Sequence, residues 1–290
     1  MHVAVLASPE SWYLKDLRRA AEGRHRITQV GFHQLRSTLA SDVDAVSSPE
    51  IELNQADCIL VRTMPPGSLE QVVFRMDALA RLEAAGKLVV NPARAVEAAV
   101  DKYLASAKLQ AAGLLIPRTI VCQTVDDAIQ AFKDLGQDVV IKPLFGAEGR
   151  GIARITDEAM AERAFRLLAD LRAVIYLQEF IQHAGHDLRV FIAGDRVLGM
   201  RRRNPLDWRT NVSRGALAEA VELKPQEIEQ ARIAAAAIGA PLAGVDLLPG
   251  RDGKLYSIEV NAVPGWQALS RTLKIDVAAL VLDYLERALS

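Results

Sequence analysis

Short apolar runs alternate with helical segments over residues 2–92, and this alternation restricts the fold more than any other feature. The runs HVAVLA, RITQV, ADCILVRT and KLVVN have strand length, and the segments 11–23 and 68–86 between them are helical. Short strands separated by helices indicate a parallel sheet with crossover helices. Ligands of such sheets bind beyond the carboxyl ends of the strands, where Ser8, Arg62 and Thr63 lie; each is equally compatible with a loop residue without a role.

Length and charge narrow the possible partners. The chain has 290 residues, which predicts two or three compact units. A net charge of -1 gives no general field for nucleic acid or anionic lipid, so we expect neither as a partner. No segment approaches the roughly 20 apolar residues that span a bilayer, and the run VAVLA is too short for a signal peptide. Cys58 and Cys122 lie in apolar runs typical of buried, reduced thiols, which predicts a cytoplasmic protein.

The remaining sequence predicts two further units after one helix over 95–114. The second unit has strands at 117–122, 138–144, 152–155 and 174–181 and helices at 124–136 and 160–171. The third has a hairpin turning at Gly194-Asp195, a helix at 225–240, two strands that turn at Asp252-Gly253, and a final helix at about 275–289.

A glycine-rich stretch, VVIKPLFGAEGRGIARI, occupies residues 139–155. A strand delivers Lys142, and Gly146, Gly149 and Gly151 leave little side-chain bulk in the loop that follows. Backbone N–H groups of such a loop can cradle phosphate oxygens beside the lysine charge. An ordinary flexible hairpin would have the same composition, so this stretch alone leaves both interpretations open.

Two polar segments follow. In LQEFI, Glu179 ends an apolar strand and Asp187 comes shortly after, a combination that can recognise adenine and ribose. The segment MRRRNPLDWRTNVSRGA, residues 200–216, contains five arginines, which can bind carboxylate or phosphate and neutralise charge in phosphoryl transfer. A solvated basic loop and a nucleic-acid contact are the alternatives for this cluster.

The last two strands carry an oxygen-only set of side chains. Side chains alternate along a strand, so Glu259 and Asn261 share one face. The tight turn makes AGVDLLPG and YSIEVNA antiparallel neighbours, which allows Asp246 to join them. Two carboxylates and an amide oxygen suit Mg²⁺, which shares its shell with water and substrate phosphates.

In order and spacing these motifs resemble the ATP-grasp carboxylate–amine ligases, closest to the RimK/LysX type that adds glutamate to a carboxylate. The resemblance rests on D-K at 101–102, V-I-K-P with the glycine loop, Q-E-F-I, D-x-R, W-R-T-N-x-x-R-G, and the D…E-x-N set. It implies an α/β chain, α+β in its grasp part, in which an ATP-grasp fold follows a Rossmann-like parallel-sheet domain. The implied domains are 1–92 for substrate, 93–180 as the central lid, and 181–290 with the magnesium site.

The resemblance also implies roles for particular residues. Lys102, Lys142 and the loop with Gly146, Gly149 and Gly151 would hold the phosphates, with Glu179, Phe180 and Ile181 at adenine and Asp187 at ribose. Arg203 and Arg214 would be catalytic, Arg209 and Asn211 would contact the nucleotide, and Asp246, Glu259 and Asn261 would bind two Mg²⁺ ions, with Mn²⁺ as an alternative. The sequence departs from the family pattern with Gly-Ala-Glu-Gly in the glycine loop and with Arg214-Gly215-Ala216.

The implied reaction phosphorylates a substrate carboxylate with ATP and then forms an amide with an amine, L-glutamate by resemblance. Positioning and charge neutralisation perform both steps, so no protein nucleophile is expected. The acceptor could be a tetrahydromethanopterin-type pterin, a protein C-terminus or an amino-acid carrier protein, and Trp266 could face a pterin or pack in the core. A homo-oligomer, dimer or tetramer, is expected. A nucleotide-binding regulator without catalysis is the alternative function, and an RNA-binding module is a third.

Overall fold

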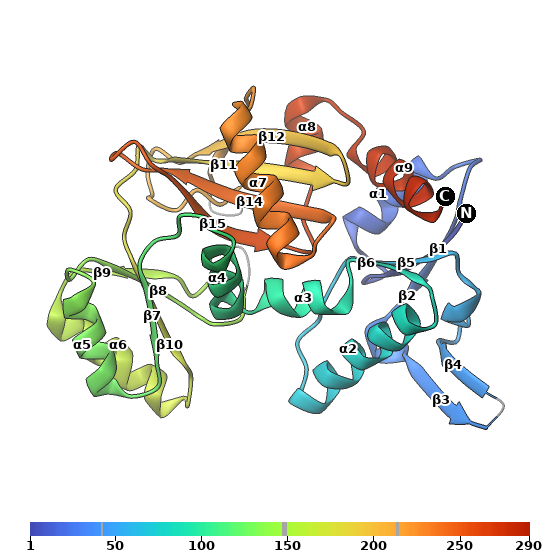
Figure 1. Ribbon diagram of the computed structural model, residues 1–290, viewed down its shortest axis with the longest axis horizontal. Helices are drawn as coiled ribbons and strands as arrows, with labels where there is room; N and C mark the ends of the chain where they lie inside the picture. Colours follow the sequence, from blue (N-terminus) through green and yellow to red (C-terminus); the bar gives the residue numbers. More distant parts are fainter. Residues whose placement is uncertain (42, 147–149, 213–214) are drawn as a thin grey trace.

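The first sheet is parallel, as the sequence predicts. The computed structural model describes residues 1–41, 43–146, 150–212 and 215–290 (Figure 1). The sheet has the strand order β2-β1-β5-β6. Its strands are β1 (His2–Leu6), β2 (Arg26–Val30), β5 (Cys58–Val61) and β6 (Leu88–Val90), and its helices are α1 (Trp12–Ala20) and α2 (Leu69–Ala84). Side chains of β1 alternate between two hydrophobic clusters, with Val3 and Val5 in one and Ala4 and Leu6 in the other. Both faces of this sheet are therefore covered, as in other parallel sheets.

Residues 31–55 form a small excursion from this sheet that the sequence pattern did not predict. Two single-turn helices, η1 (Phe32–Gln34) and η2 (Leu53–Gln55), flank an antiparallel hairpin of β3 (Arg36–Ala40) and β4 (Val43–Ser47). Arg81 of α2 donates hydrogen bonds to Ser37 and Asp44, which attach this hairpin to the helix.

The helix predicted for 95–114 is broken at Asp101 into α3 (Ala93–Val100) and α4 (Lys102–Ala111). The Asp101 carboxylate accepts hydrogen bonds from the backbone N–H groups of Tyr103 and Leu104, at 2.9 and 3.0 Å. An aspartate that caps the following turn favours a new helix start over a continuous helix. This break puts Lys102 at the first position of α4.

The central unit is an antiparallel sheet with two helices on one face (Figure 1). Its strand order is β7-β10-β8-β9, and its elements are β7 (Thr119–Cys122), β8 (Val139–Lys142), β9 (Ala153–Ile155), β10 (Ile175–Glu179), α5 (Val125–Asp134) and α6 (Glu158–Asp170). Thr124 caps α5 by accepting the backbone N–H of Asp127. Among the described residues, Phe132 and Phe165 belong to a hydrophobic cluster made of this unit only.

The C-terminal sheet is antiparallel, with strand order β13-β12-β11-β14-β15. Its elements are β11 (His186–Ala193), β12 (Arg196–Arg203), β13 (Leu217–Ala220), α7 (Pro225–Ile238), β14 (Leu242–Pro249), β15 (Leu255–Asn261), α8 (Gln267–Leu273) and α9 (Val277–Leu289). The predicted turn at Gly194-Asp195 is confirmed, since Ala193 pairs with Arg196. Helix α8 was not predicted.

Asn91 joins the first sheet to the C-terminal sheet. It follows β6, is fully buried, and donates its side-chain amide to the carbonyls of Leu242 and Ala262, the first at 2.6 Å. Its side-chain oxygen accepts the backbone N–H of Leu242 at 3.1 Å. Residues of these two sheets also share both of the larger hydrophobic clusters. The boundaries at residues 92 and 180 remain a prediction.

Other sequence expectations can be compared with the described residues. Cys58 is buried and free, whereas Cys122 is free but only half-buried. Trp266 is fully buried, and its indole N–H donates to Asp16 at 3.0 Å. Because Trp266 packs in the core, its ring cannot stack against a pterin. No described helix combines the length and apolar character needed to cross a membrane.

Candidate active site

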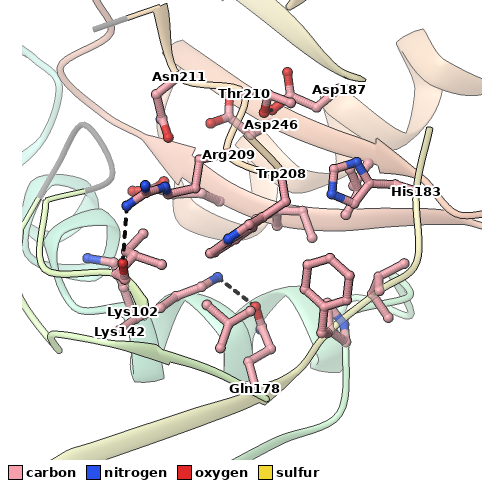
Figure 2. A pocket seen from close by; sticks show the side chains of 18 of the residues that line it. Lys102, Lys142, Gln178, His183, Asp187, Trp208, Arg209, Thr210, Asn211 and Asp246 are labelled. Atoms are coloured by element: carbon pink, nitrogen blue, oxygen red, sulfur yellow. Dashed lines mark hydrogen bonds between the residues drawn. The ribbon is translucent and has the colours of Figure 1, made fainter. Parts of the chain in front are cut away.

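A cleft lies between the central sheet and the C-terminal sheet, with about 1000 Å³ of space including its open mouth. Its two ends differ in chemistry. Figure 2 shows Lys102 and Arg209 on one side of the cleft and His183 on the other, with Trp208 between them. Pro117, Val140, Phe180, Ile181 and Leu248 also line the cleft, and so do the carboxylates of Asp246 and Glu259. A cavity with cations at one end and rings at the other fits a phosphorylated aromatic ligand.

Two lysines converge on the charged end from different elements. Lys142 ends β8, and its Nζ donates to Oε1 of Gln178 at 2.6 Å. Burial lowers the pKa of Lys142 to about 8, an effect that Glu259 opposes and Lys102 reinforces. Lys102 Nζ donates to the carbonyl of Gly146 at 2.7 Å, and burial lowers the pKa of Lys102 as well. Two partly desolvated ammonium groups side by side form a site for an anion.

The oxygen-only set meets as predicted from the strand pattern. Asp246 of β14 stands opposite Glu259 of β15, and Gly244 stands opposite Asn261, so the three side chains share one face. Asn261 Nδ2 lies 3.5 Å from the carbonyl oxygen of Gly244, an arrangement that leaves its amide oxygen available. Burial and the facing Asp246 carboxylate raise the pKa of Glu259, and Lys102 and Lys142 offset only part of this.

A divalent cation fits this face because it would relieve the repulsion between the two carboxylates. Within the described part of the chain, no three His, Cys, Asp or Glu side chains form a metal-binding group. The set therefore supplies a partial shell of two carboxylates and one amide, as is usual for Mg²⁺ bound together with phosphate oxygens.

Asp246 is also tied to two arginines. Arg189 Nη1 lies 2.7 Å from Oδ1, and Arg202 Nη2 lies 3.0 Å from Oδ2. Burial alone would raise the pKa of Asp246, but the Arg202 and Arg189 guanidiniums outweigh it and hold that pKa below its ordinary value. Asp246 is therefore ionised, and each of its oxygens is paired with one of the two arginines.

Arg202 binds Asp187 bidentately, at 2.8 and 2.5 Å, and Thr210 Oγ1 donates to the same carboxylate at 2.6 Å. Asp187 lines the cleft, but both of its oxygens are already engaged, which weakens the expectation that it holds the ribose. The arginine expected to be catalytic, Arg203, lies on the opposite face of β12, is exposed, and is absent from the cleft wall. The structure puts Arg202 there instead.

The two loops beside the lysines also meet. Arg209 forms an ion pair with Asp207 at 2.6 Å, and its Nη1 lies 3.5 Å from the carbonyl oxygen of Ile152, an edge of the glycine loop (Figure 2). Asn211 lines the cleft. Gly146 and Gly151 adopt positive φ values of 139° and 71°, which explains the need for glycine at these two positions. Gly149 and Arg214 lie outside the described residues.

Aromatic rings enclose the other end. The Phe180 ring stands edge-on to Trp208, with centroids 5.6 Å apart, and tilts against His183 at 5.7 Å. The Arg154 guanidinium lies 3.6 Å from the Phe180 centroid. Glu179 lines the cleft but accepts the backbone N–H of Arg118 at 2.9 Å. The segment Glu179 to Ile181, predicted to contact adenine, therefore lies at the ring-lined end of the cleft, and its role stays a prediction.

Sequence reasoning assigned no role to several residues of the cleft, Gln178, His183, Arg202 and Trp208, or to Arg189, which pairs with Asp246. A signal for Arg202 was present. The turn at Gly194-Asp195 fixes the hairpin register, which pairs Asp187 with Arg202 and His186 with Arg203. Counting residues outward from the turn therefore predicts that Arg202, and not Arg203, lies opposite Asp187.

A family model described as a RimK-like ATP-grasp domain matches residues 99–285, which include every cleft residue named above. The chain belongs to this RimK-like ATP-grasp family. Membership confirms the resemblance drawn from the motifs, the ATP-grasp fold behind a parallel sheet, and the class of ATP-grasp ligase. The roles of individual residues remain predictions.

Relatives of this RimK-like chain extend over its full length. It is 31% identical to a tetrahydromethanopterin:alpha-L-glutamate ligase of Methanosarcina acetivorans, with 98% of each chain covered. It is 30% identical to a probable alpha-L-glutamate ligase of Picosynechococcus sp., over 99% of this chain and 96% of the relative.

Solved structures support the fold. The ATP-grasp ligase PsnB, complexed with minimal precursor, Mg and ADP, superposes with a TM-score of 0.78 at 20% identity, covering 99% of this chain and 97% of PsnB. A RimK domain protein from Sphaerobacter thermophilus gives a TM-score of 0.73 at 22% identity, over 99% and 100% of the two chains.

Proposed function

We propose that the chain is a Mg-ATP-dependent ligase that phosphorylates a substrate carboxylate and joins it to L-glutamate. The observation that carries the proposal is the cleft itself, in which Asp246 faces Glu259 beside Lys102 and Lys142 while rings enclose the far end. The names of the relatives, both glutamate ligases, support the choice of amino acid.

In the first step a carboxylate oxygen of the acceptor attacks the γ-phosphorus of ATP, and the bond to the β,γ-bridging oxygen breaks to release ADP. Lys102 and Lys142 hold the phosphates, because their ammonium groups lie at the charged end of the cleft. In this proposal Arg202 would meet the transferred group, because it is the one arginine of the 201–203 run that lines the cleft. Its guanidinium would neutralise charge as the phosphoryl group moves.

In the second step the neutral amine of glutamate attacks the acyl carbon, inorganic phosphate leaves, and the amine loses a proton as the amide forms. The protein contributes position and a site shielded from water, since an acyl phosphate hydrolyses when water reaches it. Arg209 lies beside the glycine loop, Asn211 lines the cleft, and both would orient the phosphoryl group.

Asp246, Glu259 and Asn261 would hold magnesium. Bound there, the metal would supply positive charge that neutralises the phosphate oxygens. Two ions, with Mn²⁺ able to substitute, are part of the proposal. So are a cytoplasmic location and a homo-oligomeric state.

The acceptor we propose is a tetrahydromethanopterin-type pterin carboxylate, because a relative that aligns over 98% of the chain carries that name. A protein C-terminus and an amino-acid carrier protein are the other candidates. The buried Trp266 offers no pterin platform, so the acceptor must be recognised by other residues.

The test is phosphate release from Mg-ATP with L-glutamate and a panel of acceptors that includes the pterin, with mass spectrometry of each product. We expect one acceptor to gain the mass of a glutamyl group, and Glu259→Gln to abolish that gain. Nucleotide binding without any mass gain across the panel would leave the regulator hypothesis standing. A folded protein that binds no Mg-ATP would overturn the proposed function.

A further inference from the structure

His183 occupies a distinctive position at the ring-lined end of the cleft. It comes two residues after Ile181, in the connection between β10 and β11, and it bridges to Gly250 of the C-terminal sheet. The residue is half-buried and lines the cleft, and its imidazole is visible there in Figure 2. Nothing in the proposed phosphoryl chemistry uses it.

The hydrogen bond of its ring fixes the tautomer. The backbone N–H of Gly185 donates to Nδ1 of His183 at 3.2 Å, so Nδ1 carries a lone pair and not a proton. Burial lowers the pKa of His183, and the neighbouring His186, Arg154 and Arg251 lower it further. The neutral ring therefore carries its proton on Nε2.

This Nε2–H group is an available donor. Among the described residues it has no hydrogen-bond partner, whereas the other ring nitrogen is occupied. The ring itself is held in place by Phe180, whose other neighbours are Trp208 and the Arg154 guanidinium. Arg154 is in turn fixed by two 2.7 Å hydrogen bonds to Asp138.

A hydrogen-bond donor that lies among aromatic rings favours an aromatic ligand with a hydrogen-bond acceptor on its edge. Purine bases meet both requirements, since they stack on rings and carry unprotonated ring nitrogens. We propose that His183 recognises the base of the nucleotide by donating from Nε2–H to a purine ring nitrogen. This inference rests on the proposed function, because it takes ATP as the occupant of the cleft.

Two conservative substitutions test the roles of Nδ1 and Nε2 of His183 one at a time. In His183→Asn the amide oxygen can still accept the Gly185 N–H, but the side chain is too short to present a donor to the cleft. In His183→Gln the longer amide can present a donor near the position of Nε2. We expect the affinity for Mg-ATP to fall by about three- to tenfold in His183→Asn, the usual worth of one neutral hydrogen bond, and to recover in His183→Gln. His186→Asn, three residues further along the chain and outside the cleft wall, is the control.

Nucleotide analogues identify the acceptor atom. ATP analogues with carbon in place of N1, N3 or N7 should include one that binds wild-type protein more weakly by the same factor. The same analogue should bind His183→Asn no worse than ATP does, because the hydrogen bond is already absent. Calorimetric titration of the full-length chain gives each affinity, and 2′-deoxy-ATP is titrated in parallel.

The inference is overturned if His183→Asn binds Mg-ATP as wild type does, or if the 2′-hydroxyl rather than a ring nitrogen accounts for the difference. Failure of wild-type protein to bind Mg-ATP at all is a separate result, and it would overturn the proposed function together with this inference.

Discussion

Arg202 lies directly across the β11–β12 hairpin from Asp187, and its guanidinium also reaches Asp246 on the next strand. One side chain therefore links β11, the first strand of the hairpin, to β14, which carries the proposed metal ligand Asp246. All three groups are buried. Such a network is costly to break, because a charge left without its partner in the interior is poorly solvated.

Arg202→Met should lower the free energy of unfolding by about 3–5 kcal/mol, since it leaves two buried carboxylates without a shared cation. Arg203→Met removes the same group from the exposed face of the same strand and should change stability by about 0.5 kcal/mol or less. Urea denaturation of both variants measures the difference. Equal losses in the two variants would show that the network does not depend on Arg202.

Glu259→Gln should separate stability from activity. Removing a charge that faces Asp246 relieves repulsion, so we expect the melting temperature to stay the same or rise. Phosphate release should fall by at least about 100-fold, because mutating even residues that only support metal ligands costs up to about 100-fold in activity. Glu219→Gln, at the exposed edge of the same sheet, should keep both properties.

The free energy of unfolding of the wild-type protein should depend on pH through Glu259. Because the pKa of Glu259 is raised by burial and by Asp246, the folded chain binds more protons than the unfolded chain between the ordinary and the raised pKa. The contribution of Glu259 to the free energy of unfolding therefore falls as pH increases through that window. In Glu259→Gln that fall should be absent from the pH profile of chemical denaturation.

Lys142 predicts a pH dependence of nucleotide binding. Burial lowers its pKa to about 8, so the ammonium that would contact phosphate is lost as pH rises through that value. Affinity for Mg-ATP should weaken between pH 7 and 9.5. Lys142→Arg keeps its charge across this range and should give a flatter profile, whatever its affinity at pH 7. Isothermal titration at several pH values tests this, and parallel profiles in the two proteins would contradict it.

Asn91→Ala should weaken the junction between the first sheet and the C-terminal sheet. The substitution leaves the carbonyls of Leu242 and Ala262 and the N–H of Leu242 without their partner in a fully buried place. We expect a loss of at least about 2 kcal/mol in the free energy of unfolding. Asn54→Ala, which removes a single bond to the Val46 N–H, should cost less in the same urea experiment.

The sequence predicted those parts of the fold and site that depend on short-range pattern. Strand alternation correctly put Glu259 and Asn261 on one face, and the hairpin at Gly194-Asp195 was located correctly. The pairing of Asp246 with Glu259 also depends on a register shift between Asp246 and Leu247, which the pattern did not predict. Motif order, through the resemblance, led to the family.

The features that the sequence pattern did not predict depend on competition between local and distant contacts. Asp101 reads as one polar residue within a helical stretch, and only its capping bonds show that a helix begins at Lys102. The hairpin strands Arg36–Ala40 and Val43–Ser47 show little apolar alternation, and hydrogen bonds from Arg81 of a distant helix help to attach them. Arg203 was chosen from a run of three arginines on resemblance, although the register favoured Arg202.

The distribution of the hydrophobic clusters sets which parts of this chain can be exchanged. The central unit closes around its own cluster, so a chimaera that replaces roughly residues 118–181 with the same segment of a relative leaves the other cores intact. The parallel sheet has no such independence, because it shares both remaining clusters and Asn91 with the sheet that carries the proposed metal ligands. Transplanting the first ninety residues alone to change the acceptor would cut through those two clusters, whereas moving the first and C-terminal sheets together would preserve them.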